Sequence, residues 1–265
     1  MRRFFYPNLA RFNAGERNES ELGKADRDEV ELSDIVIELD KPESHHATRV
    51  LRLRVGDQVS VFDGAGMQGT GVIARLENRV LVKLKRLKCL PRSRVIVDIA
   101  TALPKGSHAD EMLNQLSQLG VDRVTPLLSK RSVVNPRPAK LERFRKAAIE
   151  SAKQCGRDCL MEIGEVSSLD AMIAGSEHDL KLIASATEDV SGCDLVNQKL
   201  AEVDGTDGSE PRRILVLIGP EGGWADQELA AAKDAGFVAW SLGALVMRIE
   251  TAATAAGALI CYLAR

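Results

Sequence analysis

The segment Leu215-Val216-Leu217-Ile218-Gly219-Pro220-Glu221-Gly222-Gly223 predicts a buried strand that runs into a glycine-rich turn. Its unbroken apolar start is typical of a strand covered on both faces, as in a parallel sheet. Ligands of α/β folds bind at the carboxyl ends of such strands, and glycines let them approach the backbone closely. The turn lacks the Lys-Ser/Thr pair of a phosphate loop, and Glu221 would repel a phosphate. We therefore expect a ligand with little negative charge, or with a positive charge to place.

A second segment, Ser241–Ala252, predicts a strand that ends near Gly243 and an alanine-rich helix that begins about Thr251, a residue type suited to an N-cap. Arg248 and Glu250 lie just before this helix. Taken alone, they would be solvated charges in an ordinary strand-to-helix connection. Because this segment follows the glycine turn at a suitable spacing, we interpret the two together as one candidate site.

Apolar strands alternate with helical stretches from residue 91 to residue 265. This alternation predicts an α/β domain with a mostly parallel sheet covered on both faces. The expected strands are Val95–Thr101, Arg123–Leu128, Leu180–Ser185, Ile214–Ile218 and Phe237–Leu242. The expected helices are Asp110–Leu119, Lys140–Gln154, Leu195–Val203, Asp226–Ala235 and Thr251–Leu263, with a turn-rich loop at Asp204–Pro211.

Residues 1–90 have a different pattern, and the boundary between the two domains is expected near Leu90 to Arg92. Short runs of Val, Ile and Leu alternate with polar residues and turn signals, which predicts a small β-barrel or meander. Its strands are expected at Gln58–Phe62, Thr70–Leu76 and Arg79–Leu87. Pro42–Leu53 is compatible with a helix that places His46, Arg49 and Arg52 along one side. The charged stretch Ala14–Glu31 predicts an exposed insertion.

Composition excludes several classes of protein. The 265 residues are 45% hydrophobic, which is enough for a sizeable core, and 36 basic residues against 38 acidic ones leave no global field for nucleic acid or membrane. Aromatic residues make up only 4%, which disfavours single-strand binding by a row of stacking rings. The longest apolar run, Ala252–Ala264, is shorter than the roughly 20 residues of a membrane span. With no signal peptide, we expect a soluble, cytoplasmic protein with no membrane partner.

Cysteine and histidine usage predicts no metal. The five cysteines are widely scattered and are expected to be reduced thiols: Cys89, Cys155, Cys159, Cys193 and Cys261. His45-His46 has no third ligand at a useful spacing. Trp224 and Trp240 adjoin apolar segments, so we expect both to pack rather than to stack on bases.

A local basic run, Arg75–Arg94, holds eight Lys or Arg residues and one acid, Glu77. It could contact RNA phosphates. Part of it alternates with Val and Leu, so an ordinary strand with a solvated polar face is equally compatible. The pattern does not choose between these interpretations.

The two C-terminal segments and a set of motifs along nearly the whole chain resemble the ribosomal RNA small subunit methyltransferase E family of the SPOUT superfamily. The decisive motifs are Ile218–Gly223, Leu242-Gly243, and Arg248 with Glu250-Thr251-Ala252. The supporting motifs are Arg2-Arg3-Phe4-Phe5, Arg49-Val50-Leu51-Arg52, Phe62-Asp63-Gly64, Lys105-Gly106, Leu119-Gly120-Val121 and Gln154–Arg157.

The resemblance implies a PUA-like, RNA-binding β-barrel in residues 1–90 and a SPOUT methyltransferase domain in residues 91–265. It also implies a deep trefoil knot within about 214–260, a topology that is nearly absent elsewhere. The implied activity is transfer of a methyl group from S-adenosylmethionine to N3 of one uridine in small-subunit rRNA. The substrate could be free rRNA or the assembled small ribosomal subunit, and the implied assembly is a homodimer.

The same resemblance implies two sets of site residues, those for the cofactor and those for RNA. For catalysis, our own hypothesis from the chemistry of uracil N3 is that Arg248 stabilises charge on the uracil oxygens and that Glu250 acts as general base or holds Arg248. The cofactor would contact Leu217, Ile218, Gly219, Pro220, Glu221, Gly222, Gly223, Leu242, Gly243, Leu245 and Met247. RNA would contact Arg2, Arg3, His46, Arg49, Arg52, Lys105, Lys130, Arg131 and Arg157.

Some positions depart from the family pattern. Ala244-Leu245 stands where many relatives carry Pro-Arg, so a basic side chain next to the cofactor is missing. Ser107-His108, Gln115, Gln118 and Lys153 also differ from the usual residues. Two alternatives therefore stay open. One is a catalytically weakened RNA-binding or ribosome-assembly protein of the same fold, and the other is a SPOUT methyltransferase with a different RNA target.

Overall fold

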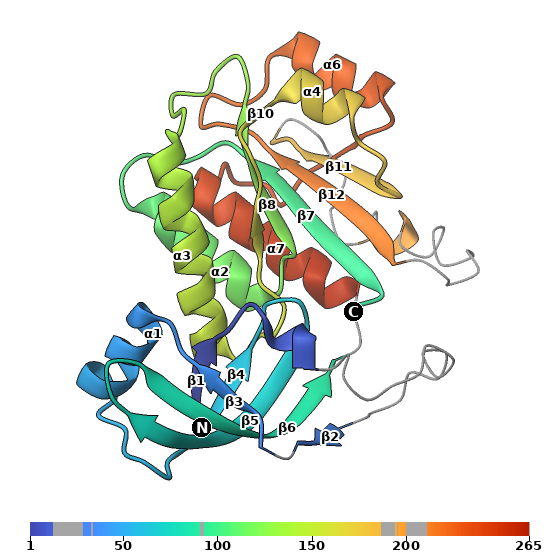
Figure 1. Ribbon diagram of the computed structural model, residues 1–265. Helices are drawn as coiled ribbons and strands as arrows, with labels where there is room; N and C mark the ends of the chain where they lie inside the picture. The colour runs from blue at the N-terminus through green and yellow to red at the C-terminus, as the bar shows by residue number, and fades with distance from the viewer. Residues whose placement is uncertain are drawn as a thin grey trace. The chain divides into compact units, whose positions relative to one another are not determined.

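The computed structural model describes residues 1–12, 29–32, 34–90, 93–186, 194, 196–199 and 211–264 (Figure 1). They form two compact units. The first contains Met1–Arg92 and Ala152–Leu160, and the second contains Ser93–Ser151 and Met161–Arg265. Most of the expected insertion and of the helix at Leu195–Val203, with the loop that follows it, lies outside the described residues, as do Cys193 and part of the expected boundary.

The first unit is built on a six-stranded sheet in the order β1-β4-β5-β6-β2, with β3 also paired to β6. The strands are β1 (Arg2–Phe5), β2 (Glu29–Glu31), β3 (Val36–Glu38), β4 (Gln58–Phe62), β5 (Met67–Leu76) and β6 (Val80–Cys89). Only the β1–β4 pair among these is parallel. Gly71 in β5 lets β6 approach closely, since a Cβ there would lie 2.3 Å from the carbonyl oxygen of Lys83. The three strands expected here are confirmed, and the end of the expected insertion, Glu29–Glu31, pairs with β6 as a strand.

The helix expected at Pro42–Leu53 is shorter and changes its winding. After η1 (Leu9–Phe12), the chain forms α1 (Lys41–His45), which Asp40 caps by accepting from Glu43 N, and then one turn of π-helix, η3 (His46–Val50). Leu51 N donates to the carbonyl of His46, which is the wider spacing of a π turn. Arg52 has a φ of 52° and cannot continue the helix. The predicted single line of His46, Arg49 and Arg52 is therefore wrong.

The second unit contains a seven-stranded sheet in the order β10-β8-β7-β12-β11-β13, with β9 paired to β8. The strands are β7 (Val95–Thr101), β8 (Arg123–Leu128), β9 (Glu162–Ile163), β10 (Ser167–Ser168), β11 (Leu180–Ala184), β12 (Arg212–Ile218) and β13 (Val238–Trp240). Every pair in it is parallel. The expected parallel sheet is confirmed, and the short β9 and β10 are additions that carry no clear sequence pattern.

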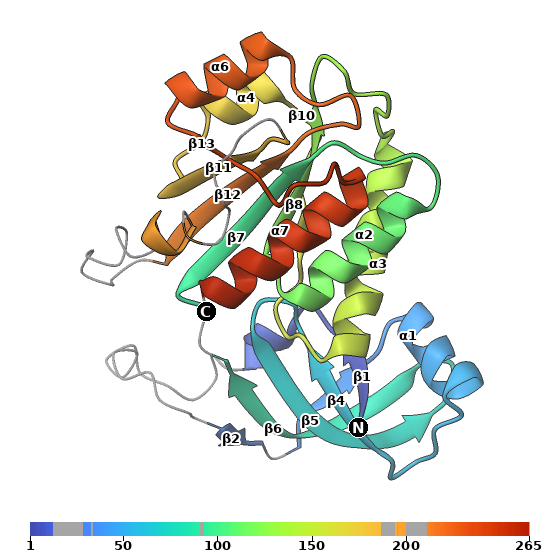
Figure 2. The ribbon, with the colours of Figure 1, turned by 180° about the vertical axis from the view of Figure 1, so that it is seen from behind.

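Helices cover both faces of this sheet (Figures 1 and 2). They are α2 (His108–Leu119), α3 (Pro138–Cys155), α4 (Leu169–Ala174), α6 (Asp226–Asp234) and α7 (Ile249–Leu263). Alternate residues of β12 show the consequence: Val216 joins the core with α2 and α7, whereas Leu217 joins the core with α4 and α6. The unbroken apolar run in β12 is thus explained by burial on both sides.

Helix ends follow ordinary capping chemistry with one correction. Gly120 ends α2 in the left-handed conformation, at a φ of 97°. The N-cap of α7 is Arg248, not Thr251, because Arg248 is extended and Ile249 already packs in the core at 2% exposure. Among the helices that the structure describes, none is long and apolar enough to cross a membrane.

Candidate functional site

A pocket of about 330 Å³ lies at the carboxyl ends of β11, β12 and β13, where the two C-terminal segments come together. Its walls are the turn after β12, the loop between β13 and α7, the end of β11 and one arginine from the loop after β8. The lining residues are Arg131, Ala184, Ser185, Ala186, Ile218, Gly219, Pro220, Glu221, Gly222, Gly223, Trp224, Asp226, Leu229, Ser241, Leu242, Gly243, Leu245, Val246, Met247, Ile249 and Ala252.

The turn after β12 is shaped by glycine and by one tryptophan. Gly223 N donates to the carbonyl of Pro220 over 2.8 Å, and Gly223 has a φ of 69°, which favours glycine. A Cβ on Gly219 would lie 2.9 Å from the Trp224 ring, so only glycine fits there without a shift. Trp224 is buried and its Nε1 donates to the carbonyl of Ala184 over 2.7 Å. The expectation that Trp224 packs is confirmed, and its ring fixes the turn to the end of β11.

The loop after β8 holds the same turn from the other side. Arg131 Nη1 donates to the carbonyls of Gly222 and Trp224, at 2.6 and 3.2 Å. The buried Glu228 carboxylate accepts from Lys130 N at 2.7 Å and from Ala225 N at 2.8 Å. Sequence reasoning missed Glu228, although an acid three residues after a helix start is a recognisable capping signal.

The opposite wall is apolar and open. In the loop after β13, Ser241 Oγ accepts from Gly243 N and donates to the Gly243 carbonyl, which fixes the bend there. Leu245 and Val246 are 80% and 83% exposed. The charged lining residues are Glu221 and Asp226, together with Arg131, whose guanidinium is already bound to the turn. The pocket therefore suits a ligand with an apolar or aromatic part and no excess negative charge.

The expected cofactor residues lie together at this pocket, with one exception. All but Leu217 line it, and Leu217 is fully buried in the core beneath the turn. Arg248 is exposed, forms no ion pair with any described residue, and is not a lining residue, although its neighbours Met247 and Ile249 are. Glu250 is half-buried in the first turn of α7.

The expected RNA contacts differ in how accessible they are. Arg3 is largely engaged within the first unit, since its Nη2 donates to Asp158 Oδ1 over 2.6 Å and its side chain is only 13% exposed. Arg157 contributes a backbone carbonyl to the same Arg3 group, and His46 lies edge-on to Phe4. Lys130 Nζ donates to Gln227 Oε1 over 2.7 Å, and Arg131 is bound to the glycine turn. The other four are exposed and form no ion pair with any residue that the structure describes: Arg2, Arg49, Arg52 and Lys105.

The basic run along β6 is partly neutralised by acids. Its ion pairs include Arg75–Glu77, Arg79–Glu38, Lys83–Asp34 and Arg86–Glu31. The hydrogen bond from Lys83 holds the pKa of the Asp34 carboxyl below its usual value. Val80, Val82 and Leu84 alternate with these charges and are fully buried. The structure thus favours a strand with a solvated polar face, and it leaves Lys85 and Lys88 exposed.

Two family models match the chain, one over each unit of its sequence pattern. The model of a family described as an RNA methyltransferase domain matches residues 91–261, and that of an RNA methyltransferase PUA domain matches residues 39–85. The ribosomal RNA small subunit methyltransferase E of Synechocystis is 30% identical over 234 residues, which cover 87% of this chain and 74% of that protein. The chain belongs to the ribosomal RNA small subunit methyltransferase E family.

Solved structures agree with this assignment. The ribosomal RNA small subunit methyltransferase E of Neisseria gonorrhoeae, bound to S-adenosylmethionine, is 26% identical with a TM-score of 0.76, and the match covers 99% of this chain and 98% of that one. A methyltransferase of Legionella pneumophila with the same cofactor bound is 27% identical with a TM-score of 0.74, covering 86% and 92%. The expected family and the α/β fold with a PUA domain are confirmed, whereas the knot stays a prediction.

Proposed function

We propose that this protein transfers a methyl group from S-adenosylmethionine to N3 of one uridine in small-subunit rRNA. The observation that carries the proposal is the pocket at the carboxyl end of the parallel sheet, walled by the two segments that also mark the family. Relatives in Neisseria gonorrhoeae and Legionella pneumophila bind S-adenosylmethionine. Membership of a family named for small-subunit rRNA supports the RNA substrate.

The lining residues fit S-adenosylmethionine. The Gly219–Gly223 turn presents backbone groups for a purine and a ribose, and Leu242 and Met247 offer apolar contact. Glu221 and Asp226 can face a positive sulfonium or ammonium, and no free lysine or arginine marks a phosphate subsite among the lining residues. When bound, the cofactor supplies an electrophilic methyl group on its sulfonium.

Arg248 and Glu250 are the proposed catalytic residues. Uracil N3 carries a proton in the neutral base, so the reaction requires that proton to leave and the resulting charge on the ring oxygens to be stabilised. Arg248 caps the 15-residue helix α7, and its guanidinium adds to the positive end of the helix dipole. It is exposed and adjoins the lining residue Met247, so it can reach a base presented at the pocket mouth. Glu250, in the first turn of the same helix, is the proposed base or the group that holds Arg248.

Residues 1–90 are proposed to bind the RNA as a PUA-like domain, and residues 91–265 to carry the chemistry. The exposed cations Arg2, Arg49 and Arg52 would contact phosphates. A homodimer is proposed as the assembly, since exposed Leu245, Val246 and Tyr262 leave apolar surface at both ends of α7.

One observation favours a second candidate function. Leu245 lines the pocket where many relatives carry arginine, so one cationic contact near the cofactor is absent. A weakened enzyme that acts as an RNA-binding or ribosome-assembly protein would result if that contact is essential. A SPOUT methyltransferase with a different RNA target would use the same donor pocket.

Donor binding and substrate choice separate these candidates. Calorimetric titration with S-adenosylmethionine should show saturable binding, and no binding would favour the weakened protein. Purified enzyme with labelled donor should then methylate small subunits that lack the modification. Incorporation only into large subunits or transfer RNA would contradict the proposed substrate and favour the other methyltransferase.

A further inference from the structure

The second unit has another pocket, of about 280 Å³, near the amino ends of the strands of its sheet. Its lining includes the charged residues Asp98, Arg123, Glu177 and Arg213, together with His178, Met172 and Leu215. Arg123 begins β8 and Arg213 is the second residue of β12, so this pocket lies toward the opposite edge of the sheet from the cofactor pocket. No residue lines both pockets.

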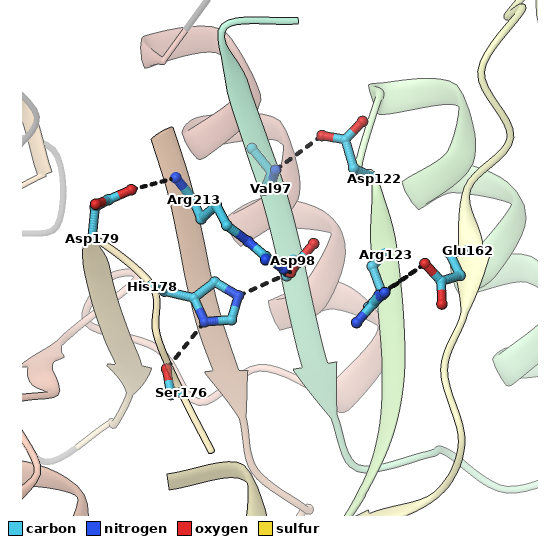
Figure 3. A network of polar contacts seen from close by, with 9 residues as sticks. All are labelled: Val97, Asp98, Asp122, Arg123, Glu162, Ser176, His178, Asp179 and Arg213. Carbon is cyan, nitrogen blue, oxygen red and sulfur yellow. Dashed lines mark hydrogen bonds and ion pairs between the residues drawn. The ribbon is translucent and has the colours of Figure 1, made fainter. Parts of the chain in front are cut away.

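Asp98 is a lining residue of this pocket that contacts two others, His178 and Arg213 (Figure 3). It lies in β7, between Arg123 of β8 and Leu215 of β12, and is only 4% exposed. Its Oδ2 is 2.9 Å from His178 Nε2 and 3.3 Å from Arg213 Nη2. Burying a carboxylate without partners costs free energy, so a buried aspartate is normally paired with a cation or accepts hydrogen bonds.

The surrounding loop is fixed so that Asp98 keeps this geometry. His178 Nδ1 lies 3.1 Å from Ser176 Oγ, which matches the tautomer with the proton on Nε2 directed at Asp98. Asp179 accepts from Arg213 N at 2.7 Å and donates its own N–H to the Arg213 carbonyl at 2.9 Å. These two hydrogen bonds hold the loop before β11 against β12 without a ligand. A loop that is already ordered loses less conformational entropy when a ligand binds.

One oxygen of Asp98 is left unused. Both of its contacts end on Oδ2, and Oδ1 accepts no hydrogen bond from any residue that the structure describes (Figure 3). The fully buried side-chain atoms without a hydrogen-bond partner do not include Asp98 Oδ1, so part of this oxygen is accessible to solvent. A nine-tenths buried carboxylate with a free, accessible oxygen is suited to an N–H donor of a ligand, and best to a positive one.

The remaining charges of the pocket specify a second group on that ligand. Arg123 uses Nε and Nη2 for Glu162, and Arg213 uses Nη2 for Asp98, which leaves further N–H groups of both guanidinium ions available among the described contacts. Both arginine side chains are a little over two-fifths exposed, at 42% and 44%, as expected for groups at a pocket mouth. Guanidinium ions bind carboxylates with two parallel hydrogen bonds.

We propose that this pocket binds a small zwitterion of the α-amino acid class. The ligand's ammonium donates to Asp98 Oδ1, its carboxylate accepts from Arg213 and Arg123, and its side chain lies against Met172 and Leu215. The lining carries Asp98 and Glu177 against Arg123 and Arg213, and Arg123 is already paired with Glu162, so the pocket has no excess positive charge that would favour an anionic ligand. A mononucleotide fits less well, because its dianionic phosphate would lie near two carboxylates.

Ligand-observed saturation-transfer NMR of the full chain with each standard α-amino acid tests the proposal, and calorimetry then measures the affinity of any that binds. We expect at least one to bind saturably. Its amide, which lacks the carboxylate, and its deaminated acid, which lacks the ammonium, should each bind at least about tenfold more weakly.

Two variants locate the site. Asp98→Asn and Arg213→Gln should each weaken binding about tenfold or more. Asp34→Asn, which removes a carboxylate from a surface ion pair in the first unit, should change nothing. Circular dichroism and thermal unfolding show whether each variant is folded. If Asp98→Asn does not fold, Arg213→Gln alone tests the site.

The proposal is overturned if no α-amino acid binds or if Arg213→Gln leaves the affinity unchanged. Binding of uridine 5′-monophosphate alone, with the same dependence on Arg213, would overturn it in favour of a nucleotide site. None of these outcomes depends on methyltransferase activity.

Discussion

Two pockets lie at opposite ends of the strands of the same parallel sheet, and they are built in different ways. At the carboxyl edge, backbone dominates: glycines shape the turn, and Trp224, Arg131 and Glu228 hold it from outside. At the amino edge, side chains dominate, with a buried carboxylate held by His178 and Arg213. The residues of the cofactor pocket are contiguous in sequence motifs, whereas those of the second pocket come from four separate segments of the chain. The comparison shows why a pattern in the sequence reveals one and not the other.

Arg248→Ala should have the largest effect. We expect roughly a 100- to 1000-fold fall in methyl transfer, as for the loss of a preorganised donor at a developing oxyanion, with donor affinity unchanged. Single-turnover assays and calorimetry measure the two quantities separately. Arg143→Ala is the matched control, since Arg143 is an exposed helix residue paired with Asp110, and it should retain full activity. Full activity of Arg248→Ala would remove Arg248 from the catalytic pair.

Gly219→Ala tests whether backbone shape sets the carboxyl-edge pocket. The added Cβ would lie 2.9 Å from the Trp224 ring and must displace it, so affinity for S-adenosylmethionine should fall tenfold or more. Gly156→Ala is the control. A Cβ there would meet no atom within 4 Å, so the substitution strains only the backbone, which has a positive φ at this residue. It should lower stability by about 1 kcal/mol and leave donor binding intact. Unchanged affinity in Gly219→Ala would show that the turn adapts.

Glu228→Ala tests the support behind that turn. The substitution leaves the N–H groups of Ala225 and Lys130 without their acceptor, so the free energy of unfolding should fall by about 1–3 kcal/mol. Chemical denaturation measures this, and donor titration should show weaker binding as well. A variant that is destabilised but binds the donor with native affinity would limit Glu228 to a structural role.

Asp34→Asn should have the smallest effect, because its ion pair with Lys83 is exposed to solvent. Since the pKa of Asp34 is lowered in the folded protein, any stabilisation is present above the ordinary carboxyl pKa and is lost as the pH falls through the lowered value. At pH 7 the melting temperature should stay unchanged within error. A clear loss there would mean that the β6 charges matter more than surface pairs usually do.

Much of the fold was accessible from the sequence because it depends on local patterns. The apolar run in β12 predicts a strand because it is buried on both faces. Gly120 predicts the end of α2 because it takes the left-handed conformation there. The π turn at His46–Val50 was not accessible, since its wider spacing leaves no distinct residue pattern. The N-cap at Arg248 was misplaced because Ile249 begins the helix by packing in the core, which outweighs the intrinsic preference of Thr251.

The candidate cofactor site was largely predictable, and the second pocket was not. Ten of the eleven expected cofactor residues line the pocket, since they are contiguous within two segments. Leu217 does not line the pocket, because alternation along β12 directs its side chain into the core. Asp98 and His178 are 80 residues apart, and Asp98 is a single polar residue in an apolar strand. They come together because β12 pairs with both β7, which carries Asp98, and β11, which follows His178.

Nucleoside analysis of the reaction product tests the central claim most directly. Small subunits lacking the modification are incubated with the enzyme and isotope-labelled S-adenosylmethionine, and their rRNA is digested and resolved by mass spectrometry. We predict that the label appears as 3-methyluridine at a single position, and that Arg248→Ala reduces it strongly. Label on ribose or on another base, or no label in a protein that binds the donor, would contradict the proposed function.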